Sequence, residues 1–191
     1  MVTGSGARIY SLGIGDFNRD NIPDLVVGGN VGKGLYLLLG KGDGSFLAST
    51  DQDGGSNSLV VGDFTGDTIS DVVATTSTTA IISRGNGDGT LSRIGEYTVA
   101  NPYTAWTTVG DLNGDGKLDV AIANNADANV GVLLGKGDGT FGEVVKFATD
   151  PAPSFVTTGD FDGDGKLDLV VNNHNDAYKS TQVLLNTGCK P

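Results

Sequence analysis

The sequence predicts an all-β fold: a β-propeller-type array of four blades, each an antiparallel four-stranded sheet, with the last blade incomplete. Composition is the first reason. Of the 191 residues 31 are glycine, and no stretch of helix-forming residues exceeds a few positions, which favours short strands and tight turns. The second reason is a nine-residue acidic motif that begins at Asp16, Asp63, Asp111 and Asp160, at spacings of 47, 48 and 49 residues. A period of about fifty residues is typical of repeat proteins built from one supersecondary block per unit.

The repeats predict one domain over residues 1–191, with blades at approximately 1–50, 51–99, 100–149 and 150–191. The third repeat is the clearest, and its four strands are predicted at residues 105–112, 118–123, 130–134 and 144–148. Asp138-Gly139 lies between its last two strands and is typical of a hairpin, because glycine adopts the positive φ that such turns require. In the fourth repeat the turn fails after Gly188, and no fourth strand follows.

The second strand of each repeat is a continuous apolar run. These runs cover residues 25–27, 72–74, 120–122 and 169–171. Because they do not alternate polar and apolar residues, both faces of each sheet are expected to be buried. A small antiparallel sheet covered on both faces fits a blade between two neighbours, in a propeller or an open segment of one.

The acidic motifs predict calcium sites. Ca²⁺ takes about 6–8 oxygen ligands, which combine carboxylates with carbonyl groups and water. Side chains at motif positions 1, 3, 5 and 9 and the carbonyl at position 7 can converge on one ion, whereas three carboxylates without a cation would repel one another. The predicted ligands are Asp16, Asn18, Asp20, Ile22, Asp24, Asp63, Thr65, Asp67, Ile69, Asp71, Asp111, Asn113, Asp115, Lys117, Asp119, Asp160, Asp162, Asp164, Lys166 and Asp168.

Two other calcium motifs and a turn without metal are the alternatives. An EF-hand requires a glutamate at position 12, where this chain has Val27, Ala74, Ile122 and Val171, and stacked nonapeptide repeats would require a nine-residue period. Asp, Asn and Gly also form turns, which would suffice for one copy but not for four copies in register.

The loops should differ in affinity. Repeats three and four have glycine at positions 4 and 6, and repeat four alone has an aspartate, Asp162, at position 3. Repeat two has the neutral hydroxyl of Thr65 at position 3 and crowds its coil with Thr68. We therefore expect repeats three and four to bind most tightly, repeat one less tightly and repeat two most weakly.

Charge and composition exclude several functions. The net charge of −11 argues against nucleic acid, whose phosphates require Lys and Arg. The longest apolar run, residues 35–39, is far shorter than the roughly 20 residues that cross a bilayer, and the N-terminus lacks the apolar segment of a signal peptide. His174 and Cys189 are the only residues of their kinds, which argues against a Ser-His-Asp, Cys-His or zinc site within one chain. We expect no enzyme activity.

The residues around the loops resemble a known family. Gly-Asp-Phe or Gly-Asp-Leu leads into the loops, and Leu-Leu-Gly-Lys-Gly-Asp-Gly-Thr-Phe follows in the third repeat. This pattern resembles the FG-GAP or VCBS repeats of integrin α-chain-like β-propellers, and the resemblance covers nearly the whole chain. It implies Ca²⁺ on one face and ligand on the opposite face, in proteins that include adhesion molecules, secreted lectin-like binders and accessory domains of polysaccharide-active enzymes.

The resemblance also implies a closed ring of about seven blades, within the range of known propellers. Four blades are too few for such a ring. We therefore expect either a homo-oligomer, with a dimer as the leading arrangement, or a fragment of a longer propeller.

Polar segments after the second strands and aromatic residues between blades are the candidates for ligand contact. Amides suit sugar hydroxyls because they both donate and accept hydrogen bonds, and an aromatic ring offers a stacking platform. The candidates are Tyr103, Trp106, Asn125, Asp127, Asn173, His174 and Asn175. The alternative is that asparagine serves turns and that Trp106 packs between blades, as Phe155 would in the next repeat.

These observations predict a non-catalytic, calcium-binding repeat domain for adhesion or for binding a protein or glycan ligand. It would be secreted or displayed on a cell surface, with no nucleic-acid partner and no membrane insertion. Two alternatives stay open: an accessory propeller segment of a secreted carbohydrate-active enzyme, and a purely structural repeat whose calcium only holds the blades together.

Overall fold

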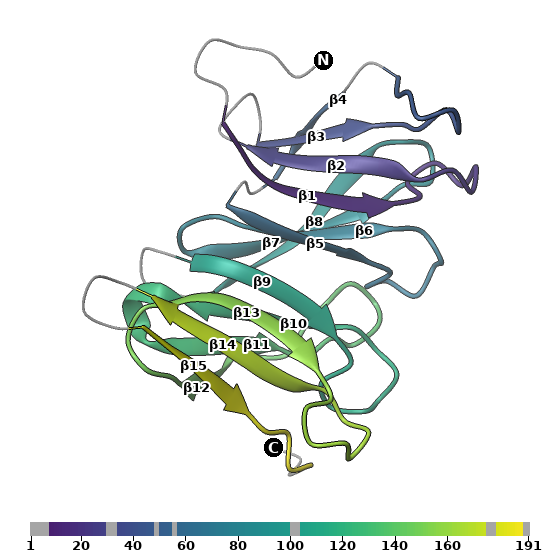
Figure 1. The fold of residues 1–191 in the computed structure, drawn as a ribbon. Helices are drawn as coiled ribbons and strands as arrows, with labels where there is room; N and C mark the ends of the chain where they lie inside the picture. The colour runs from purple at the N-terminus through teal and green to yellow at the C-terminus, as the bar shows by residue number, and fades with distance from the viewer. Residues whose placement is uncertain are drawn as a thin grey trace.

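The fold is a succession of four small antiparallel sheets (Figure 1). The computed structural model describes residues 8–29, 34–47, 50–54, 57–99, 104–174 and 179–188. In each sheet, consecutive strands are neighbours, so every blade is a simple meander. Apart from one short 3₁₀ turn, η1 (Asn125–Asp127), the described elements are all strands. The predicted all-β array of four blades is confirmed.

The strand bounds follow the repeats. Blade one contains β1 (Ile9–Gly15), β2 (Asp24–Gly29), β3 (Gly34–Leu38) and β4 (Thr50–Asp53). Blade two contains β5 (Ser58–Gly62), β6 (Asp71–Thr75), β7 (Thr79–Gly85) and β8 (Leu91–Thr98). Blade three contains β9 (Thr104–Gly110), β10 (Asp119–Asn124), β11 (Asn129–Leu133) and β12 (Val145–Ala148). Blade four contains β13 (Pro153–Gly159), β14 (Asp168–His174) and β15 (Lys179–Leu184).

The predicted strands of the third repeat agree with the structure to within about two residues, the usual uncertainty of strand ends. The fourth sheet has three strands among the described residues, as the failed turn predicts. A cavity of about 860 Å³ lies between blades three and four, and its lining includes Leu134, Phe147 and Leu184. It lies where Phe141 has no counterpart in the described part of blade four.

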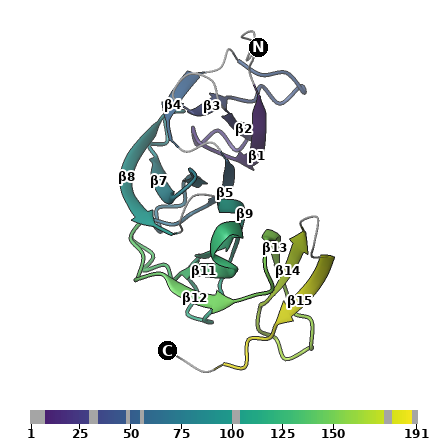
Figure 2. The same ribbon diagram turned by 90° about the vertical axis from the view of Figure 1, so that its left-hand side faces the viewer.

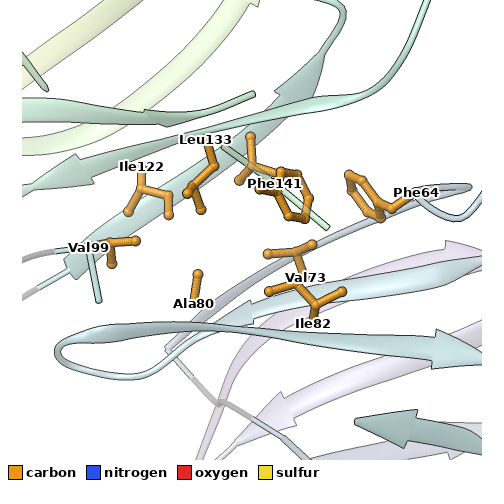
Figure 3. Packing of buried hydrophobic residues seen from close by; sticks show 9 residues of the cluster. Phe64, Val73, Ala80, Ile82, Val99, Ile122, Leu133 and Phe141 are labelled. Atoms are coloured by element: carbon orange, nitrogen blue, oxygen red, sulfur yellow. The ribbon is translucent and has the colours of Figure 1, made fainter. Parts of the chain in front are cut away.

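The core lies between the blades. All residues of β6 and β10 are buried, because successive side chains of a strand point to opposite faces and each face meets a different neighbour. Val73 packs in a cluster with residues of blade three, whereas Val72 and Ala74 pack with residues of blade one. Figure 3 shows the cluster between blades two and three, where the rings of Phe64 and Phe141 lie 5.8 Å apart.

The first strand of each blade contacts the first strand of the next. β1 contacts β5, β5 contacts β9, and β9 contacts β13. The blades therefore follow one another around a propeller axis (Figure 2). Within the described residues, no comparable contact joins the first blade to the fourth. No helix in these segments is long and apolar enough to cross a membrane.

Candidate functional site

The four acidic loops join the first and second strands of their blades, and all four lie at the same end of the molecule (Figure 1). Each loop is a tight coil in which motif positions 4 and 6 both have positive φ. The residues concerned are Arg19, Asn21, Gly66, Thr68, Gly114, Gly116, Gly163 and Gly165. The two turns direct consecutive backbone N–H groups toward the inside of the coil.

The aspartate at position 1 organises this coil. Asp111 Oδ1 accepts hydrogen bonds from the backbone N–H of Gly114 at 2.7 Å and Asp115 at 3.1 Å, and its Oδ2 accepts from Gly116 at 2.8 Å. Asp160 accepts from the glycines at positions 4 and 6 in the same way. The position-5 side chain continues the pattern, since Asp115 Oδ1 accepts from the N–H of Lys117 at 3.0 Å. These hydrogen bonds hold the backbone of the loop in a fixed coil.

The aspartate at position 9 is buried and joins two parts of the blade. Asp119 is fully buried, its Oδ2 accepts from the N–H of Leu112 at 2.9 Å, and its Oδ1 accepts from the N–H of Gly135 at 2.7 Å. Burial raises the pKa of Asp119, and the nearby Asp115 and Asp111 raise it further. The bridge ties the acidic loop to the backbone just beyond the third strand.

The same bridge occurs in the other three blades. Asp24, Asp71 and Asp168 each accept from the residue at position 2 and from Gly40, Gly85 or Asn186, respectively. Sequence reasoning identified these aspartates only as ligands and missed this structural role. The sequence feature that could have indicated this role is the Gly or Asn that recurs at or just after the end of each third strand, as in Leu-Leu-Gly.

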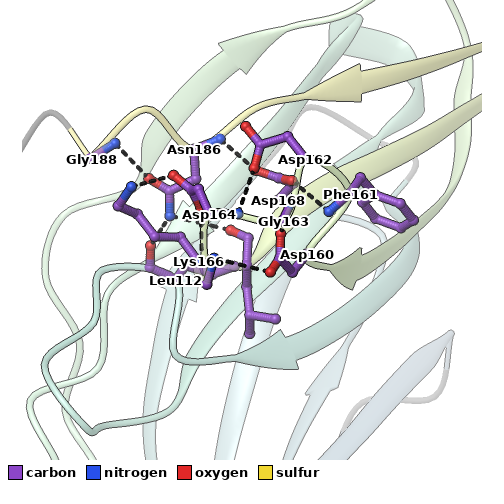
Figure 4. Close-up of polar contacts among 12 residues, drawn as sticks. Leu112, Asp160, Phe161, Asp162, Gly163, Asp164, Lys166, Asp168, Asn186 and Gly188 are labelled. Atoms are coloured by element: carbon purple, nitrogen blue, oxygen red, sulfur yellow. Dashed lines mark hydrogen bonds and ion pairs between the residues drawn. The ribbon is translucent and has the colours of Figure 1, made fainter.

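The fourth loop provides the clearest donor set (Figure 4). Oxygens of Asp160, Asp162 and Asp168 all lie within 4.8 Å of one another, the one group of three acidic, histidine or cysteine donors at this spacing in the described segments. Since Ca²⁺–oxygen distances are 2.3–2.6 Å, two ligands of one ion can be up to about 5 Å apart. This all-oxygen set therefore fits Ca²⁺.

Lys166 lies beside this donor set. Its ammonium pairs with the Asp164 carboxylate, and this hydrogen bond lowers the pKa of Asp164 and raises that of Lys166 (Figure 4). The pair is exposed to solvent, so it is easily exchanged for another contact of the carboxylate. The role of the Lys166 carbonyl as a ligand stays a prediction.

The second loop is different because an arginine already pairs with one of its carboxylates. Arg84 approaches Asp67 Oδ2 with Nε at 3.1 Å and a terminal nitrogen at 3.0 Å. Burial acts to raise the pKa of Asp67, but hydrogen bonds from Ile69, Arg84 and Thr65 outweigh it, so the pKa is lowered. Sequence reasoning missed this ion pair. The sequence feature that could have indicated it is Ser-Arg-Gly at the end of β7, where the third repeat has Leu-Leu-Gly.

The candidate ligand-contact residues lie at the opposite end of blades three and four. Trp106 of β9 and Phe155 of β13 have ring centroids 5.3 Å apart and are 39% and 41% exposed. The sequence left two possibilities for Trp106: packing between the blades, or exposure as a stacking platform for a ligand. The structure leaves the pair accessible, and it adds Phe155 to the candidate surface.

The polar candidates divide into two groups. Asn125 and Asp127 lie on η1, where the Asn125 amide donates to the carbonyl of Pro153 at 3.2 Å and Asp127 pairs with Lys146 at 3.4 Å. His174, at the end of β14, is exposed. Asn173, by contrast, is fully buried, and its amide nitrogen donates to Gln182 at 3.1 Å. Its side chain therefore packs inside the blade. Tyr103 and Asn175 lie outside the described residues.

The blades and their acidic loops define a β-propeller built from tandem repeats. Three overlapping stretches, residues 16–74, 63–122 and 111–171, match the model of the FG-GAP-like repeat. Because these matches together span most of the sequence, the chain belongs to the FG-GAP-like repeat family.

The fold is similar to that of a solved lectin structure. An Agrocybe aegerita lectin, described for its specific recognition of non-reducing terminal N-acetylglucosamine, is 23% identical with a TM-score of 0.60, over 92% of this chain and 52% of the lectin chain. The chain thus spans about half the length of that lectin. A chain of the Photorhabdus luminescens Tc holotoxin pore is 20% identical with a TM-score of 0.46, over 98% of this chain and 9% of its own. No curated protein matches the chain.

Proposed function

We propose that the chain is a non-catalytic, calcium-stabilised propeller domain that binds a glycan. The observation that carries this proposal is that acidic residues and exposed aromatic residues gather at opposite ends of the blades. The acidic loops occupy one end of the blades, whereas an accessible aromatic pair flanked by polar residues occupies the other. The metal would hold the blades in shape, and the opposite end would contact the ligand.

The calcium part rests on charge and geometry. Thirteen of the 23 acidic residues lie in the four loops, where their mutual repulsion opposes the folded state unless cations are bound. A bound Ca²⁺ supplies positive charge and coordination to these carboxylates, three of which already lie together in the fourth loop. Calcium modules of extracellular proteins bind the ion with a Kd of about 10⁻⁴–10⁻³ M, and we propose that these loops belong to that class. Secretion or surface display is part of the proposal for this reason.

The glycan part rests on the Trp106–Phe155 pair. Aromatic rings present a large apolar area with little conformational freedom, and the indole N–H adds a donor. Asn125 and His174 lie at the same end of the blades and can donate and accept hydrogen bonds around an apolar platform. The structural similarity to a sugar-recognising lectin supports the same ligand class.

The sole tryptophan provides a direct test, because Trp106 is both the proposed contact and the only indole fluorophore. Titration with oligosaccharides, including one with a terminal N-acetylglucosamine, should give a saturable change in its fluorescence. Trp106→Phe and Phe155→Ala should weaken binding at least tenfold in calorimetry. The matched control is Phe147→Ala, which removes a ring that is 46% exposed on β12.

Two results would count against the proposal. Absence of binding across a broad glycan array, for a protein that is folded in calcium, would reject the glycan ligand and leave a structural repeat. Equal weakening by Phe147→Ala would show that the aromatic pair is not the contact.

A further inference from the structure

Each blade has two faces of different composition. We call the side toward the following blade the forward face and the side toward the preceding blade the backward face. On the forward face, motif position 2 carries Phe17 in blade one and Phe64 in blade two, which are 0% and 3% exposed in the joints between blades. Phe161 occupies the same position in blade four and is 53% exposed. Among the residues that the structure describes, none covers the forward face of blade four in this way.

The backward face of blade one is uncovered in the same way. Leu59 of β5 and Val156 of β13 face the preceding blade and are 7% and 0% exposed. Leu12 holds the corresponding place in β1, since it pairs with Val27 as Leu59 pairs with Ala74, but it is 55% exposed.

The residue after the hairpin turn is likewise buried between two blades in the middle of the array but exposed in blade one. Phe141 forms a bridge with Gly135 and is 3% exposed in the joint between blades two and three, whereas Phe46 forms the same bridge with Gly40 and is 37% exposed.

The three internal joints show what covers such faces. In every joint, a forward face meets a backward face, and in the middle joint the ring of Phe64 packs on the ring of Phe141 (Figure 3). Within the described residues, blade four thus presents an unpaired forward face and blade one an unpaired backward face. We propose that the forward face of blade four binds the backward face of blade one in a second copy of this chain, head to tail. In this joint Phe161 takes the place of Phe64, and Phe46 takes that of Phe141.

Head-to-tail joints form closed rings when the rotation per subunit closes. Two copies of four blades supply eight, which lies within the usual range of about 4–8 blades for propellers. The exposed residues beside Phe161 support the pairing, because Val183 and Leu185 are 48% and 52% exposed. In blade three, Val132 corresponds to Val183 and is 4% exposed.

Two double variants test the pairing. Ile14 lies two residues after Leu12 in β1, on the same side of the strand, and is also exposed. Leu12→Ser with Ile14→Ser disables the backward face, and Phe161→Ser with Val183→Ser disables the forward face. The control, Ile94→Ser, removes a side chain that is 45% exposed on β8 outside both faces. Because all the replaced residues are substantially exposed, folding should be retained, which circular dichroism in calcium checks.

Sedimentation equilibrium gives the readout. The native chain and the Ile94→Ser control should associate, and each double variant alone should be monomeric. An equimolar mixture of the two double variants should form a one-to-one complex, because each supplies the face that the other lacks. A monomeric native chain at millimolar concentration would overturn the proposal. So would a double variant that still dimerises by itself, since it would show pairing of like faces. Glycan titration is independent of these outcomes.

Discussion

Thr68 has a backbone conformation that its side chain opposes. It occupies motif position 6 with φ +69°, in the left-handed region where β-branched residues are genuine outliers. The other loops place Asn21, Gly116 and Gly165 there, residues that tolerate this region better. Repeat two therefore forms the common coil at a cost in stability.

Replacement of Thr68 by glycine should raise the free energy of unfolding by about 1 kcal/mol. This is a net value, because glycine relieves the left-handed backbone strain of the folded state but also gives the unfolded chain more conformational freedom. Denaturant unfolding in EGTA measures this without a metal contribution. Thr65→Gly is the control, because Thr65 has no positive φ in the structure. An unchanged or lowered stability of Thr68→Gly would contradict the explanation.

Arg84 gives the second loop a positive charge from within the chain. Its guanidinium engages Asp67, whose counterparts at position 5 include Asp20 and Asp115. An exposed ion pair of this kind contributes about 0–1 kcal/mol, but it occupies a carboxylate that a cation would need. This contact strengthens the expectation that the second loop binds calcium most weakly.

Arg84→Leu should increase the number of calcium ions bound per chain, because it frees Asp67 and restores the leucine found at this place in repeat three. In EGTA the same variant should lose less than about 1 kcal/mol of stability. Equilibrium dialysis with isotopic calcium measures the stoichiometry. Arg93→Leu, which breaks an ion pair with Glu96 away from the loops, should leave it unchanged. An unchanged number of bound calcium ions per chain in Arg84→Leu would show that the arginine does not exclude the ion.

At the scale of the strand and its loop, the position-9 aspartate is the main polar connection. Asp119 holds the loop through Leu112 and the third strand through Gly135. Both backbone N–H groups are satisfied by a single carboxylate. The bridge makes the loop and the sheet one unit, whether or not metal is present.

Asp119→Asn should therefore destabilise the protein in EGTA by about 1–3 kcal/mol, because an amide NH₂ cannot accept a hydrogen bond and leaves a buried N–H unpaired. Asp115→Asn, on the exposed part of the same loop, should have little effect in EGTA and should weaken calcium binding. Urea titrations with and without calcium separate the two roles. Equal stability of Asp119→Asn and the native chain in EGTA would refute the structural role.

The strands and turns could be predicted because each depends on local patterns. The apolar run at 120–122 and the Asp138-Gly139 turn lie close to where the sequence puts them. The Asp67–Arg84 pair could not be derived in this way, since it joins residues that only the folded blade brings together. Asn173 illustrates the same limit, because turn-forming composition does not reveal that the strand continues through it and buries its side chain.

For the whole molecule, calcium should raise the thermal stability strongly. A ligand that binds only the native state stabilises it by about 2.7 kcal/mol per site at a hundredfold excess over Kd. Melts in millimolar calcium and in EGTA should differ by many degrees, and Asp160→Asn with Asp162→Asn should remove part of the difference. Magnesium at equal concentration is the control for ionic strength. Superimposable melts in calcium and EGTA would contradict calcium binding.

The forward and backward faces have a consequence for how such chains change in length. A stretch of about 48 residues encodes a unit whose two sides already match those of its neighbours. Duplication or deletion of one unit in the gene therefore leaves a forward face against a backward face at every remaining blade interface. Only the number of blades, and with it the total rotation around the propeller axis, changes. Lengthening by tandem duplication therefore requires no compensating substitutions at the joints between blades. The apolar faces at the two ends of the array still need a partner surface.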